Sequence, residues 1–144
     1  MSQVRPVSVA RLRALDRFVI LVFVSLARLM VRSSPTVLRT RLARLCSGVR
    51  LGSYFEVQKV RDAVLSSSSL CRGSDACLIR SVTVLLVCRW KGYVPVWCVG
   101  VAVVPPFAAH AWVEAEGRVV DEPFTVDSKA FFKVPEGSML RGTV

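Results

Sequence analysis

The spacing of apolar residues divides the chain into a helical first part and a strand-rich second part. Between residues 9 and 31, apolar positions recur at alternating steps of three and four, which is the spacing of one face of a helix. The helix is expected to end at Ser33-Ser34-Pro35, because proline disfavours helical backbone in the residue before it. The face that we expect to be buried consists of Leu12, Leu15, Val19, Val22, Leu26 and Leu29.

Three further helices are predicted before Gly92. The first covers residues 37–46, and the second begins after Ser53, which forms a capping-box pair with Glu56. The third begins at Ser74 or Asp75 and runs to about residue 90. The residues expected to face inward from the first two are Leu38, Leu42 and Leu45, and Val57, Val60 and Val64.

The remaining sequence favours strands. Residues 94–104, 107–114 and 118–122 have strand character, residues 130–134 form a short strand, and the rest of the tail is expected to be loosely structured. Ala115-Glu116-Gly117 is expected to be a three-residue hairpin loop with glycine at the left-handed position. Helices followed by antiparallel strands indicate an α+β fold. In a chain of 144 residues we expect one structural domain, with a helical region over residues 1–50 packed on a core over residues 51–144.

The positive charge is concentrated in the first third of the chain. Residues 1–50 contain ten arginines and one acidic residue, Asp16, which gives a net charge of 10 − 1 = +9. Residues 51–144 contain ten basic and nine acidic residues, which gives +1. A basic helix suits an anionic lipid surface, an acidic partner or nucleic acid, although a GC-rich genome also encodes arginine wherever a cation is tolerated. We expect no nucleic-acid partner.

The apolar run over residues 18–31 is short for a membrane span, since Arg28 interrupts it. Ser25-Leu26-Ala27 resembles a signal-peptidase site, but the helical spacing favours a core or interface helix over a signal peptide or anchor. Peripheral membrane contact through residues 18–31 stays an alternative. The five cysteines have no CxxC pair and there is one histidine, so we expect a reducing, cytoplasmic setting and neither a metal site nor a cofactor.

Cys77 and His110 are the residues that best suit catalysis. Cys77 is predicted in the first turn of its helix, where backbone N–H groups and the helix dipole favour a thiolate. His110 lies on a predicted strand and is the only imidazole in the chain. A base that activates a thiol is the arrangement of cysteine hydrolases and acyl transferases. Each residue also has a purely structural interpretation: Cys77 as a buried structural cysteine, and His110 as a hydrogen-bonded, half-buried histidine.

An acid that orients the histidine is expected at Glu122 or Asp121. If Glu114 lies opposite Arg118 across a three-residue loop, His110 faces Glu122. In that register the numbers of paired residues sum to 232. A two-residue loop whose paired numbers sum to 231 selects Asp121 instead. We favour Glu122.

Several segments in this order resemble the leader peptidase of lasso-peptide biosynthesis, a member of the transglutaminase-like cysteine protease superfamily with a papain-like core. They are Asp75-Ala76-Cys77-Leu78-Ile79-Arg80-Ser81, Val99-Gly100-Val101, Ala109-His110-Ala111-Trp112-Val113-Glu114, and Val119-Val120-Asp121-Glu122. The resemblance covers about residues 57–132, and the N-terminal third is also similar to that family. It implies that Cys77 is the nucleophile, His110 the base and Glu122 the orienting acid, with Asp121 as the alternative.

The same resemblance implies a function and its partners. The substrate would be the leader peptide of a ribosomally made precursor, presented by a separate leader-recognition protein, because the chain is short for a fused recognition module. An ATP-dependent cyclase would act next on the core peptide. Two other functions fit the residues: a transglutaminase or deamidase, and a basic docking protein without catalysis.

Overall fold

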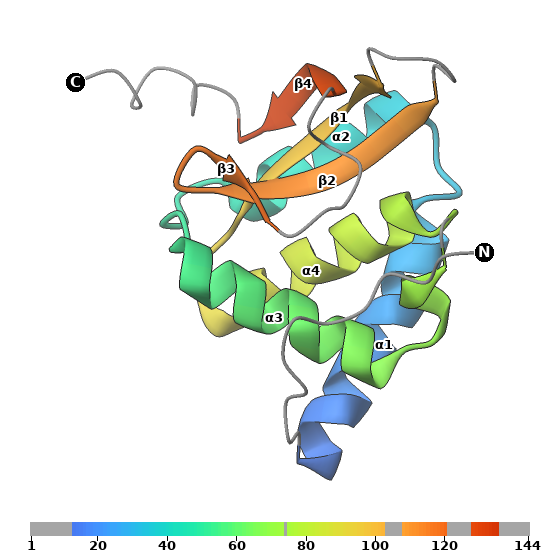
Figure 1. Cartoon of the computed structure of the whole chain (residues 1–144), viewed down its shortest axis with the longest axis vertical. Helices are drawn as coiled ribbons and strands as arrows, with labels where there is room; N and C mark the ends of the chain where they lie inside the picture. Colours follow the sequence, from blue (N-terminus) through green and yellow to red (C-terminus); the bar gives the residue numbers. More distant parts are fainter. Residues whose placement is uncertain (1–12, 74, 103–107, 121–127, 136–144) are drawn as a thin grey trace.

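The computed structural model describes residues 13–73, 75–102, 108–120 and 128–135, which form four α-helices, a short 3₁₀ turn and a four-stranded sheet (Figure 1). This arrangement confirms the predicted α+β fold. The elements are α1 (Ala14–Met30), α2 (Pro35–Cys46), α3 (Tyr54–Ser67), η1 (Leu70–Arg72), α4 (Cys77–Lys91), β1 (Val96–Ala102), β2 (Ala109–Ala115), β3 (Arg118–Val119) and β4 (Ser128–Val134).

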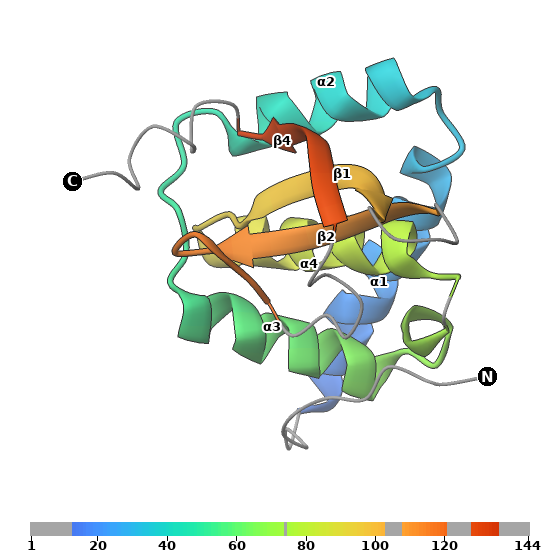
Figure 2. The ribbon, with the colours of Figure 1, turned by 45° about the horizontal axis from the view of Figure 1, so that its top comes forward.

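α4 is the central helix of the domain. It runs beneath β1 and β2, with α1 and α3 packed on its other side (Figures 1 and 2). Its middle is buried from Arg80 to Cys88, as its apolar sequence predicts. It ends at Gly92, whose φ of 99° is in the left-handed region that glycine adopts at helix ends. One hydrophobic cluster includes residues from α1, α2, α3, α4 and the sheet, so the N-terminal helices pack on the same core.

α1 packs with a different face from the one predicted. The buried residues are Ile20, Val24, Ala27 and Met30, whereas Leu15, Val22, Leu26 and Leu29 are exposed and Val19 is half-buried. Leu12 and the predicted start of the helix lie outside the described residues. The helix is apolar around most of its circumference, so two stripes at helical spacing compete. The stripe that contains Ala27 is the buried one, and α1 packs mainly against α4.

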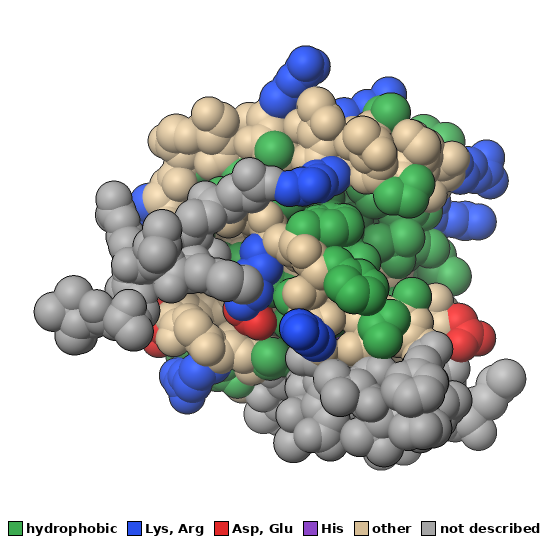
Figure 3. All heavy atoms as spheres, turned by 90° about the horizontal axis from the view of Figure 1, so that it is seen from above, with side chains coloured by type: hydrophobic (Ala, Val, Ile, Leu, Met, Phe, Trp, Pro, Cys, Tyr) green, Lys and Arg blue, Asp and Glu red, His purple; other side chains and the backbone are tan. Residues whose placement is uncertain are grey.

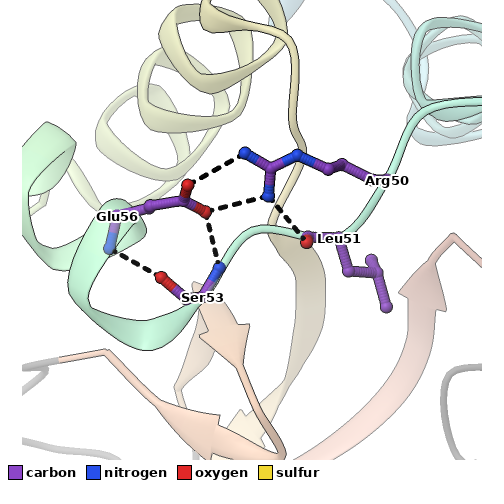
Figure 4. A network of polar contacts seen from close by, with 4 residues as sticks. All are labelled: Arg50, Leu51, Ser53 and Glu56. Carbon is purple, nitrogen blue, oxygen red and sulfur yellow. Dashed lines mark hydrogen bonds and ion pairs between the residues drawn. The ribbon is translucent and has the colours of Figure 1, made fainter.

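Local signals set the start of α2 and α3. Ser34 caps α2 with Pro35 in its first turn, so this helix begins two residues earlier than predicted. The predicted capping box of α3 is confirmed: Ser53 Oγ accepts from the Glu56 N–H at 3.2 Å, and Glu56 accepts from the Ser53 N–H at 2.9 Å. Arg50 binds the same carboxylate at 2.9 Å (Figure 4). The hydrogen bond from Arg50 lowers the pKa of Glu56 to about 2, so this network stays charged at neutral and mildly acidic pH.

The sheet has the order β3-β2-β1-β4, and all neighbours are antiparallel. One face covers the main core with Trp97, Val113 and Val134. The other face has a smaller cluster around Val96, Cys98 and Trp112. The strands match the predictions apart from their ends, and residues 103, 104, 107, 121 and 122 of the predicted strands lie outside the described part.

β4 bends across β1 at a register shift next to Gly100 (Figure 2). A Cβ atom on Gly100 would lie 2.0 Å from the carbonyl oxygen of Lys129, so a larger residue there would force the two backbones apart. Gly100 pairs with His110 of β2 on its other side. The close approach of β1 and β4 therefore occurs directly beside the histidine.

The hairpin between β2 and β3 differs from the prediction. Its loop has two residues, Glu116 and Gly117, with φ angles of 54° and 73°. Ala115 pairs with Arg118, and Glu114 pairs with Val119, so Ala115 belongs to the strand. The predicted three-residue loop is therefore wrong. Two left-handed residues in succession give the turn a twist that matches the twist of the flanking strands.

Basic side chains lie both at the edge and in the middle of the face seen in Figure 3, and hydrophobic side chains gather beside them. Acidic side chains are sparse on this view. None of the helices in the described part of the chain is both long enough and apolar enough to span a membrane.

Candidate active site

Cys77 is the first residue of α4, in agreement with its predicted place in the first turn. Ala76 precedes it and provides no side-chain cap. The first hydrogen bond of the helix runs from the Arg80 N–H to the Ala76 carbonyl at 2.8 Å. The first backbone N–H groups of a helix have no acceptor within the helix, and the positive end of its dipole lies there. Both features favour negative charge on the Cys77 sulfur.

Arg80 fixes the backbone that precedes the helix. Its guanidinium is buried and donates to the carbonyls of Cys71 at 3.0 Å and Gly73 at 3.3 Å. In the next position, the Ser81 hydroxyl accepts from Trp97 Nε1 at 3.0 Å. The start of α4 is thus attached to the preceding turn through Arg80 and to the sheet through Ser81. These contacts restrict the position of the thiol relative to β2.

His110 lies half-buried near the start of β2. Trp112 lies two residues further on the same face, and its ring stacks on the imidazole at 5.7 Å between centroids and 20° between planes. Trp112 Nε1 donates to Glu114 at 3.1 Å, and Lys133 of β4 donates to the other oxygen of Glu114 at 2.8 Å. His110, Trp112 and Glu114 therefore form a row of contacting side chains, and the ion pair between Glu114 and Lys133 holds the end of this row that lies away from the imidazole.

The backbone N–H of Ala111, next to His110 on the edge of β2, is available to the Cys77 sulfur. The Val120 N–H donates to the Val113 carbonyl, so the odd-numbered residues of β2 direct their backbone groups toward the β3 side. β3 pairs only with Glu114 and Ala115, so it does not extend to Ala111. The Ala111 backbone instead hydrogen-bonds to Cys77. The thiol thus occupies a ladder position that no described strand fills.

Cys77 and His110 are in hydrogen-bond contact. Burial acts to raise the pKa of the Cys77 thiol. The hydrogen bonds from the His110 side chain and the Ala111 backbone, together with the positive charges of His110 and Arg80, outweigh that effect and hold the pKa below its usual value. The structure therefore brings together two residues, 33 positions apart in the sequence (110 − 77), in an arrangement that favours a thiolate.

The other four cysteines have the opposite environment. All five cysteines lie in the described part and are free thiols. Burial raises the pKa of Cys46 to about 11, and it also raises the pKa values of Cys71, Cys88 and Cys98. Only Cys77 combines a half-buried position with a lowered pKa, so it is the most reactive thiol expected in this chain.

The position of the orienting acid is not described. Asp121 and Glu122 both lie outside the described residues. The argument for Glu122 required paired residue numbers that sum to 110 + 122 = 232, and the argument for Asp121 required 110 + 121 = 231. The observed pairs sum to 115 + 118 = 233. The hairpin register therefore supports neither acid.

Two parts of the site were missed from the sequence. Arg80 could have been noticed in the sequence, because it is the one charged residue between positions 78 and 88 and lies three residues after the cysteine. The Ala111 N–H has no signal in the sequence, because every residue except proline has a backbone N–H. Only the pairing of the strands shows that this N–H is available to the sulfur. Among the residues that the structure describes, no group of three or more His, Cys, Asp or Glu side chains is arranged to hold a metal ion.

Comparison with protein families gives one result. The profile described as "Transglutaminase-like superfamily" matches residues 20–135, which is more than half of the 144-residue chain. The match includes Cys77, His110 and both acids. Searches of the curated proteins and of the solved structures give no match.

Proposed function

This chain belongs to the transglutaminase-like superfamily, and we propose that it is a cysteine endopeptidase that removes the leader peptide from a ribosomally made lasso-peptide precursor. The superfamily includes cysteine proteases and acyltransferases. The observation that carries the proposal is the hydrogen-bonded pair of Cys77 and His110, with a thiol pKa below its usual value. Such a pair is what acyl transfer to sulfur requires.

The narrower assignment to leader removal is supported by the sequence around the two residues. Cys77-Leu78-Ile79-Arg80-Ser81 and His110-Ala111-Trp112-Val113-Glu114 resemble segments of the lasso-peptide leader peptidase. Several residues of these two segments also have structural roles around the site. Arg80 anchors the turn before Cys77, Ser81 accepts a hydrogen bond from Trp97, and Trp112 stacks on His110. These contacts are observed independently of the resemblance and are consistent with it.

The proposed reaction begins with attack by the Cys77 thiolate on the carbonyl carbon of the scissile peptide bond. A C–S bond forms, and the carbonyl electron pair moves to oxygen, which the N–H groups at the start of α4 are placed to stabilise. The C–N bond then breaks as His110 gives its proton to the departing amine of the core peptide. Water, deprotonated by His110, hydrolyses the thioester and releases the leader with a free carboxylate.

The partners are part of the proposal. A separate leader-recognition protein would present the precursor, and an ATP-dependent cyclase would use the released core. All three proteins would meet in the cytoplasm.

The direct test mixes the purified protein and a leader-recognition protein with a synthetic precursor, and follows the products by mass spectrometry. The proposal predicts a free core peptide and a leader that ends in a carboxylic acid. Added hydroxylamine should convert part of the leader to a hydroxamate, because it competes with water for the thioester. Intact precursor with amine joined to a glutamine side chain would instead identify a transglutaminase.

The orienting acid can be identified by two variants that remove charge with little change of shape, Asp121→Asn and Glu122→Gln. We propose Glu122, on the spacing from the histidine that the family resemblance implies. Glu122→Gln should lower the cleavage rate by about 10²-fold or more and leave a rate above that of a Cys77 variant, because an acid that orients the base does not form the covalent bond. Asp121→Asn should change the rate less than about threefold. The reverse order of effects would assign the role to Asp121.

A further inference from the structure

The outer face of α1 is an unpartnered apolar surface within the described structure. It consists of Leu15, Phe18, Leu21, Val22, Leu26 and Leu29. Leu15 is 70 % exposed, Phe18 65 % and Leu29 63 %. These residues lie opposite Ile20, Val24 and Ala27, which pack into the core. A soluble helix normally has polar residues on its outward side, so a continuous apolar outer face indicates an interaction surface.

The borders of this face have the side chains that suit a membrane interface. Arg17, Leu21 and Arg28 follow one line along the helix, and both arginines are exposed. On the opposite border Trp90 is 57 % exposed and is attached to α1 through Phe23, with ring centroids 6.4 Å apart. Arginine contacts lipid phosphates while its stem covers apolar surface, and tryptophan prefers the level of the headgroups.

The outer face has little to offer a protein partner. Its one polar side chain is Ser25, and the Ser25 hydroxyl donates to the Leu21 carbonyl at 3.0 Å within the helix. Protein interfaces carry about one hydrogen bond per 100–200 Å². A lipid interface needs none. A second copy of the chain is also disfavoured, because residues 1–50 carry a net charge of 10 − 1 = +9 and two such regions would repel each other.

We propose that the outer face of α1 binds the surface of an anionic membrane, with α1 parallel to the bilayer and its apolar side chains inserted below the headgroups. α1 is a 17-residue helix, long enough to lie in the interface as a monotopic anchor. α4 lies between α1 and the sheet, so a membrane on this face leaves the edge of β2 beside His110 accessible (Figures 1 and 2). The inference rests on the surface alone and holds for any reaction at Cys77.

The experiment is flotation of the full chain with vesicles of phosphatidylcholine alone or of phosphatidylcholine with phosphatidylglycerol. The wild type should float with the anionic vesicles, less with the neutral ones, and less at high salt. The variant Leu15→Ser/Phe18→Ser/Leu29→Ser should bind the anionic vesicles at least about tenfold more weakly, because three large apolar groups no longer insert. Arg17→Gln/Arg28→Gln should lose about tenfold on anionic vesicles only.

The control variant Phe131→Ser/Leu70→Ser removes two exposed apolar residues outside the outer face and should bind as the wild type does. Circular dichroism checks that each variant is folded, and all replaced positions are exposed. A wild type that does not float with anionic vesicles at low salt would overturn the proposal. A folded triple variant that floats like the wild type would also overturn it. A dimer in solution that the triple variant converts to a monomer, without vesicle binding, would assign the face to a second copy.

Discussion

Replacing Cys77 by alanine is expected to lower the rate of leader removal by about 10⁴-fold or more. The reason is that the sulfur forms the covalent bond in the first step, and no described side chain near it can take that role. The Cys77 thiol is also the one whose pKa lies below its usual value. The rate is measured by mass spectrometry of the precursor, leader and core over time.

The matched control uses the other thiols. Cys46→Ala, Cys71→Ala, Cys88→Ala and Cys98→Ala should each retain roughly a tenth of the activity or more, although each removes a buried side chain and lowers stability. Substantial cleavage by Cys77→Ala, with the same products, would exclude a cysteine nucleophile.

Replacing His110 by alanine is expected to have an effect of similar size. The substitution removes both the base and the donor of a hydrogen bond to the Cys77 sulfur. Burial of the thiol remains, so the Cys77 pKa should rise, and less thiolate should be present at neutral pH. The loss in rate should therefore diminish as the pH is raised toward the new thiol pKa, which a pH–rate profile measures.

Glu114→Gln provides the control for His110. It weakens the contacts of Trp112 and Lys133 but leaves the imidazole in place, so the rate should fall much less than in His110→Ala. A His110→Ala variant with near-normal cleavage would show that the histidine has only a packing role.

The fold was largely predictable because its local signals are strong. The capping box of Ser53 and Glu56 determines the start of α3, and Gly92 determines the end of α4. The valine-rich sequence after Gly92 marks the change from helix to strand. The buried face of α1 was not predictable from spacing, because two apolar stripes run along this helix and only the packing against α4 distinguishes them. The outer face of α1, most of which the spacing predicted to be buried, is therefore better explained by an interaction at the surface than by a place in the core.

The candidate site was predictable in its two main residues and not in their surroundings. Cys77 and His110 were suggested by their residue type and context. The hairpin register was wrong because a two-residue loop requires a left-handed backbone at Glu116, which a residue with a side chain adopts only when the strands stabilise it. The Ala111 hydrogen bond follows from that same short β3, so it could not be derived before the strand pairing was known.

The most direct test measures the reactivity of Cys77 as a function of pH. The full chain is alkylated with iodoacetamide at a series of pH values, and the modified cysteines are quantified by peptide mass spectrometry. If His110 and Cys77 form the pair described above, Cys77 reacts before the other four thiols, its midpoint lies below the ordinary value of 9.0, and His110→Ala moves that midpoint upward. A midpoint that is at or above 9.0 in the wild type, or that His110→Ala leaves unchanged, would contradict the pairing.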